Sequence, residues 1–184
     1  MKRIGVLLLC LCLLLAGCGA AKTAETVPAT ETTEAPLSME EYTQLITESA
    51  AKIESDALGV GNLALYEVKY LSTLSKISGE TDIPEDTIDK ALEWIEKNSD
   101  YTKESMEKAY KDNSADYKEI ALAKVPEGAD KIWELYDTYF TAYMNLHNLA
   151  MAPAGSVTIF AANGNDYIQT MTTTKSELDI LLSN

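Results

Sequence analysis

The chain has 184 residues with 29 acidic and 15 basic side chains, so its formal net charge at neutral pH is −14. Nucleic acid is therefore not an expected partner, because phosphate binding depends on clustered lysine and arginine. Arg3 is the only arginine, which also argues against a site that holds a carboxylate or phosphate through two parallel hydrogen bonds.

The start of the chain predicts an export signal. Lys2 and Arg3 supply positive charge, and residues 4–15 form an apolar run interrupted only by Gly5. A helix needs about 20 apolar residues to cross a bilayer, so this run is too short to span one and is typical of a secretory signal peptide.

The apolar run closes on Leu15-Ala16-Gly17-Cys18. This segment resembles the lipobox of bacterial lipoproteins, in which an aliphatic residue and two small ones precede a lipidated cysteine. The resemblance implies that Cys18 takes a diacylglyceryl thioether and becomes the N-terminus once residues 1–17 are removed. We therefore expect a protein held by lipid on the extracytoplasmic face of the bacterial cell membrane. The alternative is an ordinary signal peptide, or a short membrane helix, in which Cys18 is incidental.

Removal of the signal peptide changes the composition of the mature chain. Cys10 and Cys12 leave with it and Cys18 is acylated, so the domain has no thiol for a disulfide or a metal site. Lys2 and Arg3 also leave, which takes the formal net charge to −16. Acidity of this kind mainly favours solubility, and an acidic recognition role is the second interpretation.

The mature chain divides into a tether and one domain. Residues 18–36 comprise Cys18 and a stretch rich in Ala, Thr, Glu and Pro, which predicts a disordered tether whose threonines are open to glycosylation. Residues 37–184 are expected to form a helical bundle domain.

The first predicted helix covers residues 38–79. Ser38 and Glu41 match a capping box, and Gly79 suits the position after a helix end. Gly59 and Gly61 fall inside it, where each costs about 1 kcal/mol relative to alanine. We expect them to admit a close-packed neighbour or to mark a kink, and we favour the neighbour.

Residues 84–124 are predicted to be helical, as one helix or as two. Pro84 would open the first, capped by Asp82, and the second would run from Thr102 to Lys124. No Gly or Pro separates the two segments, which is why a single long helix is the alternative.

Residues 129–151 form the most apolar predicted helix, with apolar residues on two sides. A helix of this kind is usually sandwiched between neighbours, so we expect it to be central. Ser156 is the expected cap of a last helix, whose apolar residues from Phe160 to Leu181 follow a heptad-like spacing. Together the segments predict an all-α, up-and-down bundle of four or five helices.

The whole chain resembles a loose group of exported helical lipoproteins of Gram-positive bacteria. The shared features are the lipobox, the Thr/Glu-rich tether, the aromatic helix and a P-x-G-S turn at residues 153–156. The resemblance implies no known activity and no site residues beyond Cys18.

The residues expected for catalysis or metal binding do not occur in a recognisable pattern. His147 is the only histidine, so the sequence lacks the paired Glu-x-x-His and the His-Glu-x-x-His motifs of metal sites. No Gly-x-Ser-x-Gly motif presents a nucleophile. We therefore predict no catalytic residue, no metal site and no cofactor.

One stripe of residues on the 129–151 helix offers a binding surface. Trp133, Tyr136, Tyr143 and His147 are spaced along one side of it, and tyrosine and tryptophan provide broad contact area for a ligand or partner. Core packing is the preferred interpretation of this stripe, and contact with a ligand or partner is the alternative.

These observations lead to two hypotheses about function. The first is a non-catalytic interaction or envelope-structural module, whose partners are the membrane, through Cys18, and an envelope or surface protein. The second is a small-ligand-binding or sensory module that uses an aromatic groove between the 129–151 helix and the last one. An exposed groove would favour the second hypothesis, and a closed dry core the first.

Overall fold

The computed structural model describes residues 37–79 and 81–183. The predicted signal peptide, Cys18 and the predicted tether lie outside the described residues. Within them there are five helices and no strand, which confirms the all-α class: α1 (Met39–Ser78), α2 (Thr87–Asn98), α3 (Lys103–Leu122), α4 (Asp130–Met151) and α5 (Val157–Leu182). None of these helices is long and apolar enough to cross a membrane.

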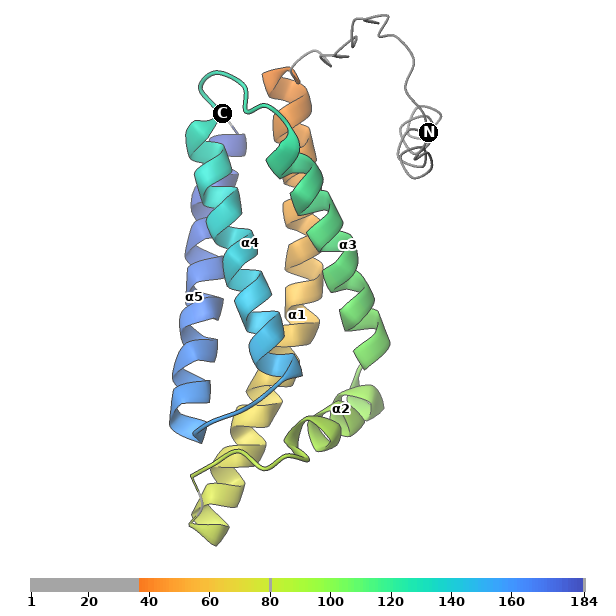
Figure 1. Cartoon of the computed structure of the whole chain (residues 1–184), viewed down its shortest axis with the longest axis vertical. Helices are drawn as coiled ribbons and strands as arrows, with labels where there is room; N and C mark the ends of the chain where they lie inside the picture. The colour runs from red at the N-terminus through yellow and green to blue at the C-terminus, as the bar shows by residue number, and fades with distance from the viewer. Residues whose placement is uncertain (1–36, 80, 184) are drawn as a thin grey trace, which may run out of the picture. The chain divides into compact units, whose positions relative to one another are not determined.

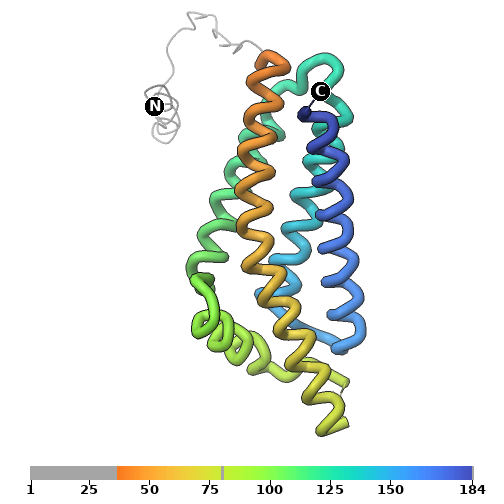
Figure 2. The backbone as a smooth tube through the Cα atoms, turned by 180° about the vertical axis from the view of Figure 1, so that it is seen from behind, coloured from red at the N-terminus to blue at the C-terminus, as the bar shows by residue number. Residues whose placement is uncertain are grey.

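Four long helices run side by side, and α2 is a short helix at one end of the bundle (Figures 1 and 2). Helices α1 and α4 run in one direction, and α3 and α5 run in the other. The up-and-down arrangement is therefore confirmed, with α2 as part of the connection between α1 and α3. Because α1 and α4 are parallel, side chains that pair between them advance along both helices together.

The ends of α1 follow from local hydrogen bonds. The backbone N–H of Glu41 donates to Ser38 Oγ over 3.2 Å, and the backbone N–H of Ser38 donates to Glu41 Oε2 over 2.9 Å. At the other end Gly79 adopts the left-handed conformation, with φ of 75°, which glycine enters without steric cost. The predicted capping box and stop are both confirmed.

Helix α1 continues through both of its internal glycines. At Gly59, a Cβ atom would lie 2.5 Å from the ring of Tyr101, so only glycine lets this ring approach. At Gly61 a Cβ atom would meet nothing within 4 Å. The expected close-packed neighbour is thus present at Gly59 and absent at Gly61.

Residues 84–124 form two helices rather than one. Ser99 has extended backbone angles, and its N–H closes α2 by donating to Ile95 O over 2.9 Å. Thr102 then caps α3, since its Oγ1 accepts from the backbone N–H of Ser105 over 3.0 Å. The chain therefore needs neither glycine nor proline to end one helix and begin the next.

The predicted start of the second helix was wrong by three residues. Helix α2 begins at Thr87, not at Pro84, and Asp82 is not its cap. Asp82 instead lies in an isolated bridge with Ser156. Backbone hydrogen bonds from Ile83 N to Gly155 O (2.9 Å) and from Val157 N to Thr81 O (3.0 Å) join the two loops at this end of the bundle.

The core lies between α1, α4 and their neighbours. Helix α4 packs against α1, α3 and α5, as expected of a sandwiched helix, while α1 packs against all four other helices. The fully buried large side chains come from all five helices: Tyr42, Ile46, Ile53, Leu63, Leu71, Ile95, Met106, Tyr136, Tyr143, Leu146, Phe160 and Leu178. The central position predicted for residues 129–151 is therefore shared with α1.

Candidate functional site

The aromatic stripe of α4 lies against α3. The ring of Phe140 stacks on Tyr117 with centroids 4.0 Å apart, and the ring of His147 stacks on Tyr110 at 4.1 Å. Trp133 also stacks on Tyr117, at 5.8 Å. Stacked rings at these separations stabilise the α3–α4 contact beyond the area they bury.

The four residues singled out on this stripe differ in exposure. Tyr136 and Tyr143 are fully buried and His147 is 6% exposed, whereas Trp133 is half-buried. The two tyrosine rings are therefore not accessible to a ligand in this arrangement, whereas Trp133 is partly accessible. The role of the stripe in binding stays a prediction.

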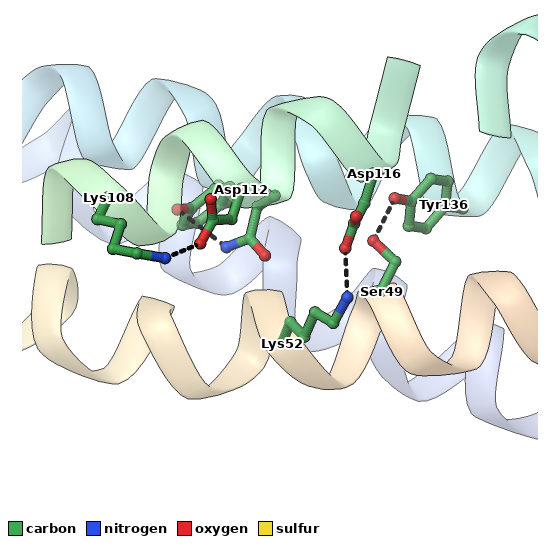
Figure 3. A network of polar contacts seen from close by, with 8 residues as sticks. Ser49, Lys52, Lys108, Asp112, Asp116 and Tyr136 are labelled. Atoms are coloured by element: carbon green, nitrogen blue, oxygen red, sulfur yellow. Dashed lines mark hydrogen bonds and ion pairs between the residues drawn. The ribbon is translucent and has the colours of Figure 1, made fainter. Parts of the chain in front are cut away.

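Polar side chains of α1, α3 and α4 also contact one another (Figure 3). Ser49 Oγ and the hydroxyl of Tyr136 are hydrogen-bonded over 2.7 Å. Lys52 extends from α1 to Asp116 of α3, with Nζ 2.6 Å from Oδ2. On α3 itself, Lys108 pairs with Asp112. Lys52 and Lys108 are thus already paired with carboxylates.

A second buried polar chain lies one heptad further along. The hydroxyl of Tyr143 donates to Asp56 Oδ2, and Nδ2 of Asn113 donates to the Tyr143 hydroxyl over 3.3 Å. Asp56 is 7% exposed, Asn113 2% and Tyr143 not at all. Burial raises the pKa of Asp56, and the hydrogen bond from Tyr143 opposes that shift. The same burial, together with Asp56, raises the pKa of Tyr143.

Asp56 and Asn113 of this chain line an open groove between α1 and α3, with a volume of about 370 Å³. They are its buried lining residues, and we call them its floor. The groove is lined by Lys52, Ser55, Asp56, Tyr101, Ser105, Ala109, Asp112 and Asn113. We call it the α1–α3 groove. A volume of this order suits a small organic molecule.

Sequence reasoning missed Asp56, although a signal was present. Ile53, Asp56 and Val60 follow helical spacing, so the carboxyl occupies a position in an apolar stripe. Ser49 and Glu67 occupy the same buried face of α1. A polar residue at such a position has to find a hydrogen-bond partner or lose its charge.

A groove is also present between α4 and α5, where the sequence hypothesis expected one. It has a volume of about 320 Å³ and is bordered by α1 as well; it is lined by Glu54, Ala57, Leu58, Tyr139, Leu146, Ile168, Met171, Thr172, Lys175, Ser176 and Asp179. Tyr139 is its one aromatic residue, and none of the four stripe residues lines it. Lys175 is paired there with Asp179 (2.7 Å) and Glu54 (3.4 Å). Aliphatic and polar side chains therefore line this groove in similar numbers, and its charged groups are paired with one another.

Glu67 is a further buried carboxyl, on α1 beyond the α1–α3 groove. It is fully buried, and neither of its oxygens has a hydrogen-bond partner among the described residues. Burial raises the pKa of Glu67 to about 9, so the group is protonated at neutral pH. It lines neither of the two grooves described above.

No group of three or more His, Cys, Asp or Glu side chains that could hold a metal ion occurs within residues 37–79 and 81–183. Comparisons with protein-family models, with curated proteins and with solved structures found no match for this chain.

Proposed function

We propose that the protein is lipid-anchored on the extracytoplasmic face of the bacterial cell membrane and that its helical body is a non-catalytic interaction module. The observation that carries the proposal is the order of features at the start of the chain. Basic residues are followed by an apolar run too short to span a bilayer, and then by Leu15-Ala16-Gly17-Cys18. A cysteine in this position is the one at which lipoproteins receive their lipid.

The charge of the chain supports a lipid as the anchor. With a formal net charge of −16 after processing, the protein has the same sign as an anionic membrane surface and is repelled by it. Each methylene buried in the bilayer contributes about 0.8 kcal/mol, so two acyl chains outweigh that repulsion.

Substitution of Cys18 tests the anchor, and Cys12 provides a matched control. We expect Cys18→Ser to release the protein into the medium or to leave an unprocessed precursor, whereas Cys12→Ser, inside the signal peptide, stays with the membrane. Mass spectrometry of the mature protein should show acyl groups on its N-terminal cysteine. A Cys18→Ser variant that is still acylated and cut before residue 18 would contradict the proposal.

The interaction module is tested by pull-down from cells that carry the lipidated protein. We expect one envelope or surface protein to be recovered reproducibly with the membrane-bound form. Recovery should fall for the Cys18→Ser variant, because the partner is met at the membrane. A bait that brings down no reproducible partner in either form contradicts the interaction role and leaves the anchor unaffected.

A second candidate function is the binding of a small ligand by the body. The specific observation in its favour is the α1–α3 groove, which is open and has the buried carboxyl of Asp56 and the buried amide of Asn113 on its floor. A groove with few polar groups at its base is the usual form of a small-molecule site. This site differs from the aromatic groove expected from the sequence.

A further inference from the structure

The floor of the α1–α3 groove has hydrogen-bonding capacity that is still unused. Asn113 donates to Tyr143, and Tyr143 donates to Asp56, so both donations run toward the carboxyl. Within the described part of the chain, Oδ1 of Asn113 and Oδ1 of Asp56 accept no hydrogen bond. Both atoms are acceptors, so a ligand group that fits this floor carries several hydrogen-bond donors.

Among the described residues that line the groove, none supplies a free cation to the carboxyl of Asp56. Lys52 is the basic residue among those that line the groove, and its Nζ is bonded to Asp116 at 2.6 Å. Asp112, which lines the groove from α3, is paired with Lys108. Asp56 is nearly shielded from water, and a charge interacts more strongly with an opposite charge in such surroundings than at an open surface.

The groove provides an aromatic wall as well. Tyr101 lines it, and the ring is seated over the Cα atom of Gly59, where a side chain on residue 59 would collide with it. The Tyr101 hydroxyl lies 3.4 Å from the carbonyl oxygen of Ser55, on the α1 side. A tyrosine ring held in place beside a carboxyl favours a cation over a neutral group.

We propose that the α1–α3 groove binds a small molecule with a primary ammonium group, which donates hydrogen bonds to Oδ1 of Asp56 and Oδ1 of Asn113. An ammonium group carries three donors, no acceptor and a positive charge, and so matches the acceptors and the carboxyl together. The inference rests on the second candidate function and is independent of the lipid anchor.

Calorimetric titration of the full mature protein in detergent tests the ligand class. Ethanolamine is the probe; ethylene glycol is a neutral control of similar size, and choline is a cation without N–H donors. We expect saturable binding of ethanolamine, with glycol and choline at least about tenfold weaker because each lacks the charge or the donors. Choline binding as tightly as ethanolamine would overturn the part of the proposal that depends on Asn113 and Asp56 as acceptors.

Variants locate the site. Asp56→Asn keeps the shape of the side chain and removes its charge, so ethanolamine should bind at least about tenfold more weakly. Asp166→Asn removes the same charge from an exposed position of α5 and should leave binding unchanged.

Ala109→Leu provides a second test that leaves Asp56 untouched. Ala109 lines the groove from α3, so a larger side chain should fill the space and reduce binding by at least about tenfold. Circular dichroism confirms that each variant is folded.

The proposal is wrong if the wild-type protein shows no saturable binding of ethanolamine, or if Asp56→Asn and Ala109→Leu both bind it as the wild type does. If a neutral probe binds the wild-type protein and Ala109→Leu weakens that binding, the groove is a ligand site but its ligand does not need an ammonium group. None of these results affects the membrane distribution of the Cys18→Ser variant.

Discussion

Tyr143 of α4 donates its hydroxyl hydrogen to Asp56 of α1, and the two residues are 87 positions apart in the chain. Ser49 and Tyr136, one heptad earlier on both helices, are hydrogen-bonded with the same separation of 87. The repeated separation shows that α1 and α4 are parallel and in a fixed register over this stretch. One of the pairs contains a carboxyl and the other contains two hydroxyl groups, so the two can be compared directly.

Tyr143→Phe should destabilise the protein more than Tyr136→Phe. The first change leaves the buried carboxyl of Asp56 and the amide of Asn113 without their shared partner, at a cost of about 1–3 kcal/mol. The second leaves a single neutral hydroxyl, that of the buried Ser49, without its partner and should cost about 1 kcal/mol, the lower end of that range. Urea unfolding followed by circular dichroism measures both. Equal losses in the two variants would mean that the charge on Asp56 has no part in the effect.

Gly59→Ala and Gly61→Ala should change stability in opposite directions. At residue 59 a methyl group would lie 2.5 Å from the Tyr101 ring, so the ring must move, at a cost of about 1–3 kcal/mol. At residue 61 the space is open, and alanine should stabilise the helix by about 0.5–1 kcal/mol. Thermal unfolding of the two variants provides the comparison. A Gly59→Ala variant as stable as Gly61→Ala would show that Tyr101 is not held against α1.

Three helix ends could be predicted from the sequence because their signals are local, whereas the start expected at Pro84 was wrong. The Ser38 capping box, Gly79 and the Ser156 cap are each formed by residues within four positions of one another. The break at Ser99 was harder to predict, since it lies between two helical patterns with no Gly or Pro. The sequence signal for this break is the pair Thr102 and Ser105, which together cap the start of α3.

The candidate site could not be predicted in the same way, because it depends on register between distant helices. Asp56 is one of 29 acidic residues, and its spacing with Ile53 and Val60 marks it as buried, but its partner Tyr143 follows only from the register of α1 and α4. The sequence predicted the aromatic stripe of α4, but it did not show which residues pack over that stripe. The residues that do so are Tyr110 and Tyr117 of α3, a helix whose pattern is mostly charged.

Glu67 should make the protein less stable as pH rises. The pKa of Glu67 is raised to about 9 in the folded protein, against about 4.3 in an unfolded chain. Between these values the folded state binds a proton that the unfolded state has lost, so the free energy of unfolding falls by roughly 1.4 kcal/mol per pH unit. This loss is absent below the unfolded pKa and complete above the folded one.

Glu67→Gln should remove that pH dependence, because the amide is neutral throughout. Glu119→Gln, at an exposed position of α3, should retain it and serves as the control. Urea unfolding at several pH values between 5 and 9 is the measurement. A Glu67→Gln variant whose stability falls with pH as steeply as that of the wild type would place the effect elsewhere in the chain.

His147 should make the protein less stable as pH falls. Burial lowers the pKa of His147, and this effect exceeds the opposing influence of Asn148 and Glu107. In the window between the lowered pKa and the unfolded value of about 6.5, the unfolded state binds the extra proton. Stability from neutral His147 is therefore complete above that window and is lost as pH falls through it.

A single histidine makes this prediction simple to check. The imidazole signals of the untagged protein, followed by NMR, should titrate below pH 6.5. His147→Phe keeps a ring stacked on Tyr110 and cannot take up a proton, so its loss of stability on acidification should be smaller. His147→Asn, which removes both the ring and the charge, should be less stable than His147→Phe at every pH. An imidazole that titrates at or above 6.5 would mean that α3 does not cover His147 in solution.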